Sequence, residues 1–212
     1  MLLLYSKISE DAHDSIVKQY LNDFDQDFQK KILRYRRWQD SQLSLLGRLM
    51  LLKAFEEYGI CGAEINNLEY NKFGKPFLKT KAVFFNISHS GDFVICAVSK
   101  KSEIGIDIEK MTAIDLADFK PQMTADEWSR VVESENKRTS FFEYWTQKEA
   151  VIKAHGHGLT LPLKSFEVLD NKTMIDGEDF YLKEIEINEE YKCYISQSIA
   201  IDEILIKEIL IN

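Results

Sequence analysis

Two short apolar segments joined by a turn constrain the fold of this chain most. VFFNISHS at 83–90 and FVICAVS at 93–99 flank Gly91-Asp92, a pair typical of a tight β-hairpin. IGIDIEK at 104–110 alternates apolar and polar residues and predicts a third strand.

Helical patterns lie on both sides of these strands. QLSLLGRLMLLKAFEEYG at 42–59 carries a broad apolar stripe and stops at Gly59, a suitable end for a helix. The other elements that we expect are helices near 124–135 and 138–154 and strands near 164–169, 180–187 and 192–200. Helix followed by strands thus occurs twice, which predicts an α+β fold of two similar halves, 1–103 and 104–212.

Composition excludes several classes of protein. The net charge of −8 argues against a general nucleic-acid binder, which needs a basic surface. No apolar run approaches the roughly 20 residues of a membrane span, and MLLLYSK at the start lacks the basic segment of a signal peptide. The three cysteines are far apart in sequence, as in a reduced protein, so we expect a cytoplasmic location.

The strand at 104–110 carries two acids on one face. Alternation puts Asp107 and Glu109 on the side opposite the isoleucines, with Cα atoms roughly 7 Å apart. Two carboxylates at that spacing can reach one small cation. The alternative is an ordinary strand whose polar face lies in water.

The helix near 138–154 places an acid among aromatic residues. At about 100° per residue, Glu149 falls in the arc formed by Phe141, Phe142, Trp145 and Ile152. A carboxylate there needs a cationic partner or a metal ion. Lys148 and Lys153 flank the arc, which suits an anionic ligand held through a metal; the alternative is a surface pair of Glu149 and Lys153.

Two further features are basic or donor-rich. QKKILRYRR places five cations between Lys30 and Arg37, which predicts either a phosphate site or a solvated helix face. Ser88, His89 and Ser90 follow one another beside the hairpin turn. This group is either a ligand-binding corner or a structural one.

Four segments in order resemble the 4′-phosphopantetheinyl transferases of the larger, surfactin-synthetase-activating type. The segments are GKP at 74–76, FNISHSGDFV at 85–94, IGIDIEK at 104–110 and YWTQKEAVIKAHGHGL at 144–159. LLGR at 45–48 is similar to the N-terminal helix of that family. The resemblance implies a pseudo-dimer of two α+β halves that moves phosphopantetheine from coenzyme A to a serine of an apo acyl or peptidyl carrier protein. It also implies a monomer, because one chain supplies both halves.

The same resemblance implies roles for individual residues. Asp107, Glu109 and Glu149 would hold a magnesium ion, with manganese as the alternative, on the diphosphate of coenzyme A. Lys153 would act on the same diphosphate and assist the leaving group, and Asp107 would also contact coenzyme A. The nucleotide end would be held by Lys31, Arg48, Lys75, Ser88 and His89.

Catalysis would then rest on positioning and electrostatics. The candidate base for the carrier serine is Glu149, or a water that it activates at the metal. Two other functions use the same residues: a metal-dependent phosphodiesterase acting on coenzyme A or a nucleotide, and a non-catalytic carrier-binding protein. Nothing in the sequence selects one carrier or pathway.

Overall fold

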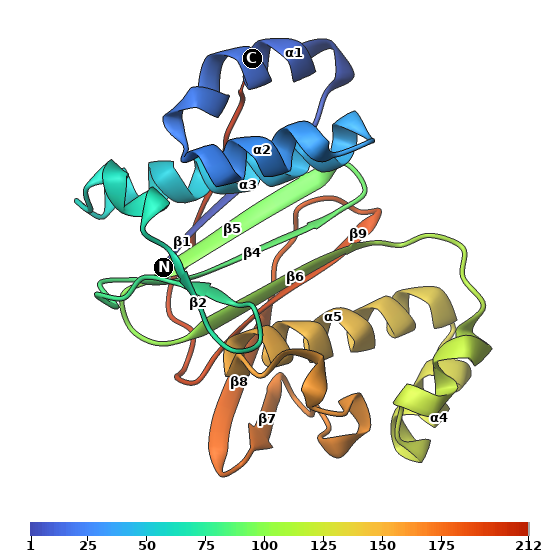
Figure 1. The fold of residues 1–212 in the computed structure, drawn as a ribbon. Helices are drawn as coiled ribbons and strands as arrows, with labels where there is room; N and C mark the ends of the chain where they lie inside the picture. The colour runs from blue at the N-terminus through green and yellow to red at the C-terminus, as the bar shows by residue number, and fades with distance from the viewer. Residues whose placement is uncertain (212) are drawn as a thin grey trace. The chain divides into compact units, whose positions relative to one another are not determined.

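Strand pairing organises the chain into two α+β units, each with its own sheet (Figure 1). The computed structural model describes residues 1–211. Residues 1–71, 76–101 and 203–211 form the first unit, and residues 72–75 and 102–202 form the second. The C-terminal residues therefore belong with the N-terminal part of the chain. Within residues 1–211, no helix combines the length and the hydropathy that crossing a membrane requires.

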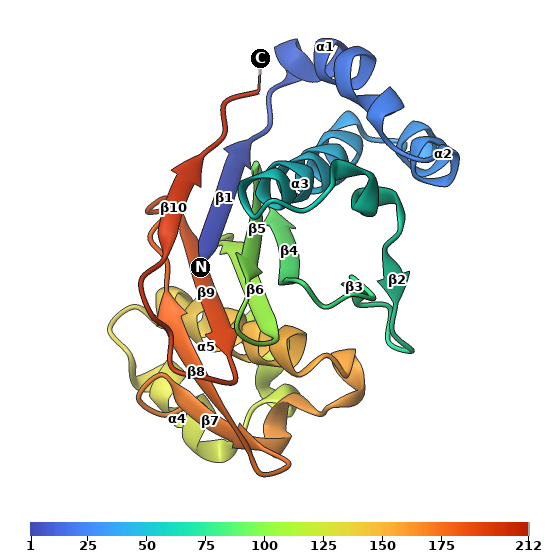
Figure 2. The same ribbon diagram turned by 90° about the vertical axis from the view of Figure 1, so that its left-hand side faces the viewer.

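The first unit is a four-stranded sheet covered by helices. Its elements are β1 (Leu2–Lys7), α1 (Glu10–Tyr20), a 3-10 turn (Leu21–Asp23), α2 (Gln26–Arg34), α3 (Trp38–Glu57), a 3-10 turn (Gly62–Asn66), the short strands β2 (Glu69–Tyr70) and β3 (Pro76–Phe77), β4 (Phe84–Ser90), β5 (Phe93–Ser99) and β10 (Leu205–Glu208). The sheet order is β10-β1-β5-β4, and β10 runs parallel to β1 (Figure 2). The predicted hairpin at Gly91-Asp92 is confirmed as the β4–β5 turn.

Helix α3 forms the core of this unit because its buried side chains surround most of its circumference. It packs on β1, β4 and β5, while α1 and α2 pack on α3. Gly47 lets the sheet come close, since a Cβ atom there would lie 2.9 Å from Ile87. The helix ends at Glu57, and Gly59 follows with a φ of 72°, as the glycine stop predicted.

The second unit places one long helix on a sheet of order β6-β9-β8-β7. Its elements are β6 (Ile104–Lys110), a 3-10 helix (Leu116–Gln122), α4 (Ala125–Glu133), α5 (Lys137–His155), 3-10 turns (Gly158–Thr160 and Leu163–Ser165), β7 (Lys172–Ile175), β8 (Glu178–Glu184) and β9 (Tyr191–Gln197). Helix α5 contacts β6, β9 and β8, and α4 packs on α5 (Figure 1). A capping box of Thr124 and Glu127 starts α4, and Gly156, with a φ of 82°, ends α5.

The two units share one topology. In each, a first strand leads through helices to a hairpin, and the first strand pairs antiparallel with the second strand of that hairpin. β1 pairs with β5 of the β4–β5 hairpin, and β6 pairs with β9 of the β8–β9 hairpin. The predicted α+β fold with two similar parts is confirmed.

Three strands differ from the sequence prediction. β1 and β10 were not predicted from the sequence. The strand expected near 164–169 is instead a 3-10 turn followed by extended chain, and the strand of that region is β7. β1 and β10 acquire their strand structure from partners distant in sequence, whereas β7 pairs with the adjacent strand β8.

Gly105 fixes the distance between α5 and β6. A Cβ atom at this position would lie 2.0 Å from the carbonyl oxygen of Ala150 and 2.3 Å from the backbone nitrogen of Ala154. Both are backbone atoms of α5, so no side-chain rotation can relieve the overlap. The helix therefore packs directly on the backbone of the strand that carries Asp107.

We expect Gly105→Ala to lower the free energy of unfolding by at least about 3 kcal/mol, because the added methyl group must push the helix away from the strand. Gly62→Ala is the control, since its Cβ meets only the flexible end of Leu52, at 3.1 Å. The control should stay within about 1 kcal/mol of wild type. Urea unfolding measures both, and equal stability of the two variants would contradict the close approach at Gly105.

Candidate active site

The polar face of β6 is covered by α5 rather than by water. Asp107 is only 3% exposed, and residues 104–108 are buried on both faces of the strand. Glu109 is half-buried. The alternative of an ordinary strand with a solvated polar face is therefore wrong for Asp107.

Asp107 and Lys153 form the central contact of the site. The Lys153 Nζ donates to the Asp107 Oδ1 at 2.6 Å, between β6 and α5. Lys153 lies less than one helical turn after Ala150, whose backbone contacts Gly105. The close approach of α5 to β6 therefore brings the Lys153 amine to Asp107. Lys153 therefore pairs with Asp107 rather than with Glu149, so the alternative of a surface pair of Lys153 and Glu149 is wrong.

Glu149 lies in the field of the two strand acids. Burial, and next the charge of Asp107, raise the pKa of Glu149. Lys153 offsets part of this rise, and Glu109 adds to it. Glu149 thus lies close enough to both strand acids for their charges to act on it.

The donor set has the chemistry of a hard-cation site that substrate would complete. Magnesium prefers oxygen ligands, and sites of this kind use one or two carboxylates together with substrate phosphate. The repulsion felt by Glu149 is what a cation would relieve. Among residues 1–211, however, no three histidine, cysteine or acidic side chains are gathered closely enough to hold a metal by themselves.

Helix α5 is buried around most of its circumference. The apolar arc that contains Glu149 is therefore only one of its buried sides. Ala150 and Ala154 face β6, whereas Phe141 and Phe142 pack in a second cluster with Met123 and Val131. Phe141 and Phe142 therefore pack toward α4, whereas Ile152 of the same arc packs with residues of the sheet strands β7, β8 and β9.

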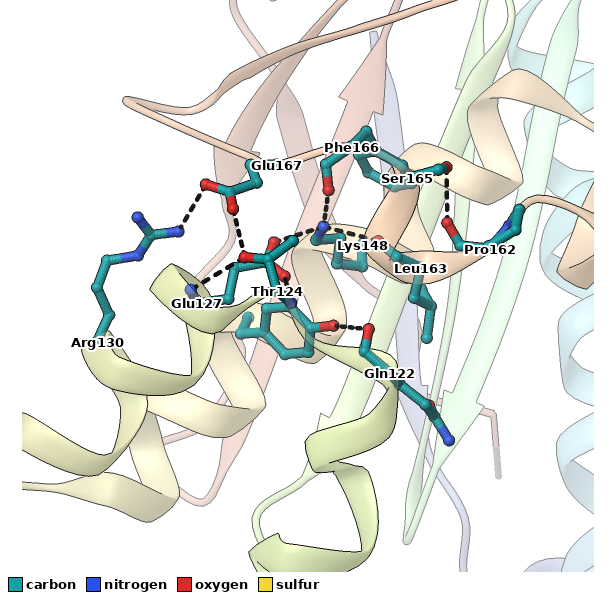
Figure 3. Close-up of polar contacts among 11 residues, drawn as sticks. Gln122, Thr124, Glu127, Arg130, Lys148, Pro162, Leu163, Ser165, Phe166 and Glu167 are labelled. Atoms are coloured by element: carbon teal, nitrogen blue, oxygen red, sulfur yellow. Dashed lines mark hydrogen bonds and ion pairs between the residues drawn. The ribbon is translucent and has the colours of Figure 1, made fainter.

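Lys148 does not flank the site as its position on the helix suggested. It is 1% exposed, and its Nζ lies 2.5 Å from the Oε1 of Glu127, itself 3% exposed (Figure 3). It also donates to the carbonyl oxygens of Leu163, at 2.9 Å, and Phe166. Burial lowers the pKa of Lys148, and Glu127 offsets part of that change. Lys148 thus joins α5 to α4 and to the 163–166 segment, and its expected role toward an anionic ligand is wrong.

Tyr194 belongs to the surroundings of the site and was missed in the sequence. It lies directly opposite Asp107 in the β6–β9 pairing. Its hydroxyl is within hydrogen-bond distance of Glu143, at 3.2 Å, and Glu184, at 3.3 Å. Only the strand register could identify it, because β9 carries no motif near this residue.

In the first unit, Lys31 and Arg48 line one hollow of about 330 Å³. Arg48 donates to the carbonyl of Ile65 at 3.0 Å and to the Tyr70 hydroxyl at 3.3 Å. Its guanidinium lies 4.8 Å from the centre of the Phe28 ring. These contacts hold one cation rigidly beside a second one, and they add Phe28 and Tyr70 to the candidate residues.

Ser88 and His89 lie on β4, the edge strand of the same sheet. Successive strand residues point to opposite faces, so the two side chains do not converge on one point. His89 shares the face of Ile87, which packs on Gly47 of α3. The predicted donor-rich corner is therefore split between the two faces of the sheet.

Lys75 lies in the second unit, against the start of β6 and the end of α5. Its Nζ pairs with Glu103 at 2.8 Å and donates to the carbonyl of Ile104 at 3.1 Å. Burial lowers the pKa of Lys75, and Glu103 offsets part of that change.

Comparisons with known proteins place this chain in a family. Residues 103–200 match the model of the "4'-phosphopantetheinyl transferase superfamily", and residues 11–101 match "4'-phosphopantetheinyl transferase, N-terminal". The chain is 31% identical over 199 residues to the 4′-phosphopantetheinyl transferase gsp of Aneurinibacillus migulanus, covering 90% of this chain and 83% of that protein.

The chain belongs to the 4′-phosphopantetheinyl transferase superfamily. It is also 33% identical over 174 residues to the transferase Sfp of Bacillus subtilis strain 168, covering 77% of each protein. The L-aminoadipate-semialdehyde dehydrogenase-phosphopantetheinyl transferase of Xenopus laevis is 26% identical over 180 residues, covering 77% of this chain and 60% of that protein.

Family membership confirms the resemblance found in the sequence and its class of activity. The chain is a transferase of the phosphopantetheinyl family, and coenzyme A is the substrate of this family. The two alternatives, a phosphodiesterase and a non-catalytic binder, receive no support from the matches.

Lys148 and Glu127 form a buried ion pair. We expect removal of one partner alone to destabilise the protein more than removal of both charges, because the remaining charge is then buried without a partner. Lys148→Met should lower the free energy of unfolding by about 3–5 kcal/mol, because Glu127 is left buried and charged. Glu127→Gln added to Lys148→Met should restore part of this loss, since the amide removes the stranded charge and still accepts from Thr124. A urea-unfolding cycle of the two single variants and the double variant measures the coupling; a double variant less stable than Lys148→Met would contradict it.

Proposed function

We propose that this transferase moves 4′-phosphopantetheine from coenzyme A to a serine of an apo acyl or peptidyl carrier protein, in a reaction that needs magnesium. The observation that carries this proposal is the contact of Asp107 with Lys153, beside Glu149. An acid-rich group with one lysine suits a diphosphate whose charge must be compensated during transfer. The family match supports the same reaction.

The reaction forms one bond and breaks one. The serine oxygen attacks the phosphorus that bears pantetheine, and the bridging oxygen of the diphosphate leaves with adenosine 3′,5′-bisphosphate. The serine proton goes to Glu149, or to a water that Glu149 activates. Lys153 stabilises the charge on the departing oxygen.

Asp107, Glu109 and Glu149 would hold the magnesium ion, with manganese as the alternative. When bound, the ion supplies charge compensation and alignment of the diphosphate. Lys153 pairs with Asp107 at 2.6 Å, so its action on the leaving group requires this ion pair to open or to be shared.

Four of the five residues to which we assign the nucleotide end of coenzyme A lie in the first unit, and Lys75 lies in the second. Lys31 and Arg48 line one hollow, and an arginine fork held by Ile65 and Tyr70 suits a phosphate. His89, Ser88 and Lys75 complete this assignment.

We further propose that the protein works as a monomer in the cytoplasm. Both α+β units stand in one chain, which supports the monomer, and sedimentation at micromolar concentration checks it. Cys96 and Cys193 are buried free thiols, which supports a reducing compartment.

The proposed function predicts cation-dependent modification of a carrier. With magnesium and coenzyme A, an apo-carrier should gain the mass of one phosphopantetheine group, as measured by mass spectrometry. Excess chelator should reduce the rate at least about a hundredfold, because the acids and the diphosphate then repel each other without compensation. Asp107→Ala should show the same loss with magnesium present.

Two outcomes of this assay oppose the proposal. Equal rates of carrier modification in magnesium and in chelator would show that the reaction needs no metal ion. The three acids would then have a purely structural role. Cleavage of coenzyme A without a carrier would instead indicate the phosphodiesterase.

Arg48→Ala and His89→Ala should raise the KM for coenzyme A by about tenfold and leave the KM for dephospho-coenzyme A nearly unchanged. Dephospho-coenzyme A lacks the 3′-phosphate to which we assign both residues. Arg138→Ala, which removes an exposed arginine near the start of α5, is the matched control and should change neither value. Equal effects on the two substrates would exclude the assignment to the 3′-phosphate.

A further inference from the structure

The outer side of α2 and the turn that follows it form an exposed basic surface, here called the α2 surface. It consists of Lys30, Leu33, Arg34, Tyr35, Arg36 and Arg37, all of which are exposed. Leu33 is 69% exposed and Tyr35 is 37% exposed, so two large apolar side chains lie among the cations. The chain as a whole has a net charge of −8, so the α2 surface is a positively charged region of an acidic protein.

Helix α2 presents two different sides. Phe28 and Ile32 are buried against the core, and Lys31 lines the hollow with Arg48. At about 100° per residue, Leu33 lies roughly 160° from Lys31 and points away from that hollow. The α2 surface therefore points away from that hollow at Leu33 and borders it at Arg34, which lies roughly 60° from Lys31.

The arginines of the α2 surface have no acidic partner among residues 1–211, and its lysine forms one exposed ion pair. Lys30 pairs with Asp27 at 3.3 Å, and both side chains are well exposed. Among residues 1–211, the side chains of Arg34, Arg36 and Arg37 form no ion pair with an acid. Arginine and tyrosine around an exposed apolar side chain are typical of surfaces that bind another protein.

We propose that the α2 surface docks an acidic face of the carrier protein, with Leu33 as its apolar anchor. This inference rests on the proposed function. An acidic carrier is repelled by the net charge of this chain, so a local basic surface is needed to steer it. A small acidic face with an apolar patch also fits better than a nucleic acid, whose continuous charge would meet the rest of an acidic protein.

The experiment compares transfer kinetics for wild type, the double variant Arg34→Glu/Arg36→Glu, and Leu33→Ser. The substrate is an apo-acyl carrier protein of negative net charge, in magnesium with saturating coenzyme A. The double variant should raise the KM for the carrier at least about tenfold, and Leu33→Ser should raise it several-fold. The kcat and the KM for coenzyme A should stay within about twofold of wild type.

Lys18→Glu/Lys183→Glu is the matched control, because it makes the same change of net charge at two other exposed lysines. Its KM for the carrier should rise much less. Added salt should raise the KM of wild type for the carrier but hardly change that of Arg34→Glu/Arg36→Glu. The attraction between the α2 surface and the carrier, which salt screens, is already absent in that variant.

Each other result decides against the inference in its own way. Equal KM values for the two double variants would assign the effect to net charge alone. A raised KM for coenzyme A would assign the surface to the nucleotide site. Unchanged carrier kinetics, with wild type but not Arg34→Glu/Arg36→Glu retained on phosphatidylserine vesicles, would assign it to a membrane. No transfer by wild type itself would overturn the proposed function, and this inference with it.

Discussion

The backbone contact between α5 and β6 at Gly105 is the constraint on which the second unit depends. It leaves no room for a side chain between helix and strand, so the helix and the acid strand keep a fixed distance and register. The Lys153 amine reaches Asp107 at 2.6 Å because of this approach, and Glu149 comes within the field of the same acid. The smallest residue of IGIDIEK thus positions the most highly charged ones.

Around this contact the two lysines of the QKEAVIK segment have opposite roles. Lys153 stands at the edge of the helix, 28% exposed, and pairs with Asp107 of the acid strand. Lys148 is enclosed and satisfied by Glu127 and two backbone carbonyls, and it connects α5 with α4 and the following segment (Figure 3). A buried ion pair of this kind contributes little to the net stability of the fold, but removal of either partner alone is strongly destabilising.

The first unit uses the same topology for different chemistry. Its first strand, β1, has no counterpart of the acids on β6, and its cations gather on α2 and α3 instead. The strand β10 pairs with the free edge of β1, so the last residues of the chain complete the sheet of the first unit. The two α+β units therefore share a topology but carry their charged side chains on different elements.

The sequence by itself determined the α+β class, the central hairpin, the acid strand, the long helices and the family. Each of these depends on local periodicity or on a motif a few residues long. Tertiary structure decided the rest: β1 and β10 are strands because of partners about 90 and 200 residues away in the chain. It also turned Lys148 inward and Lys153 toward Asp107, and it brought Tyr194 opposite Asp107. A helical wheel gives the direction of a side chain but not what packs there, and only the fold supplies that neighbour.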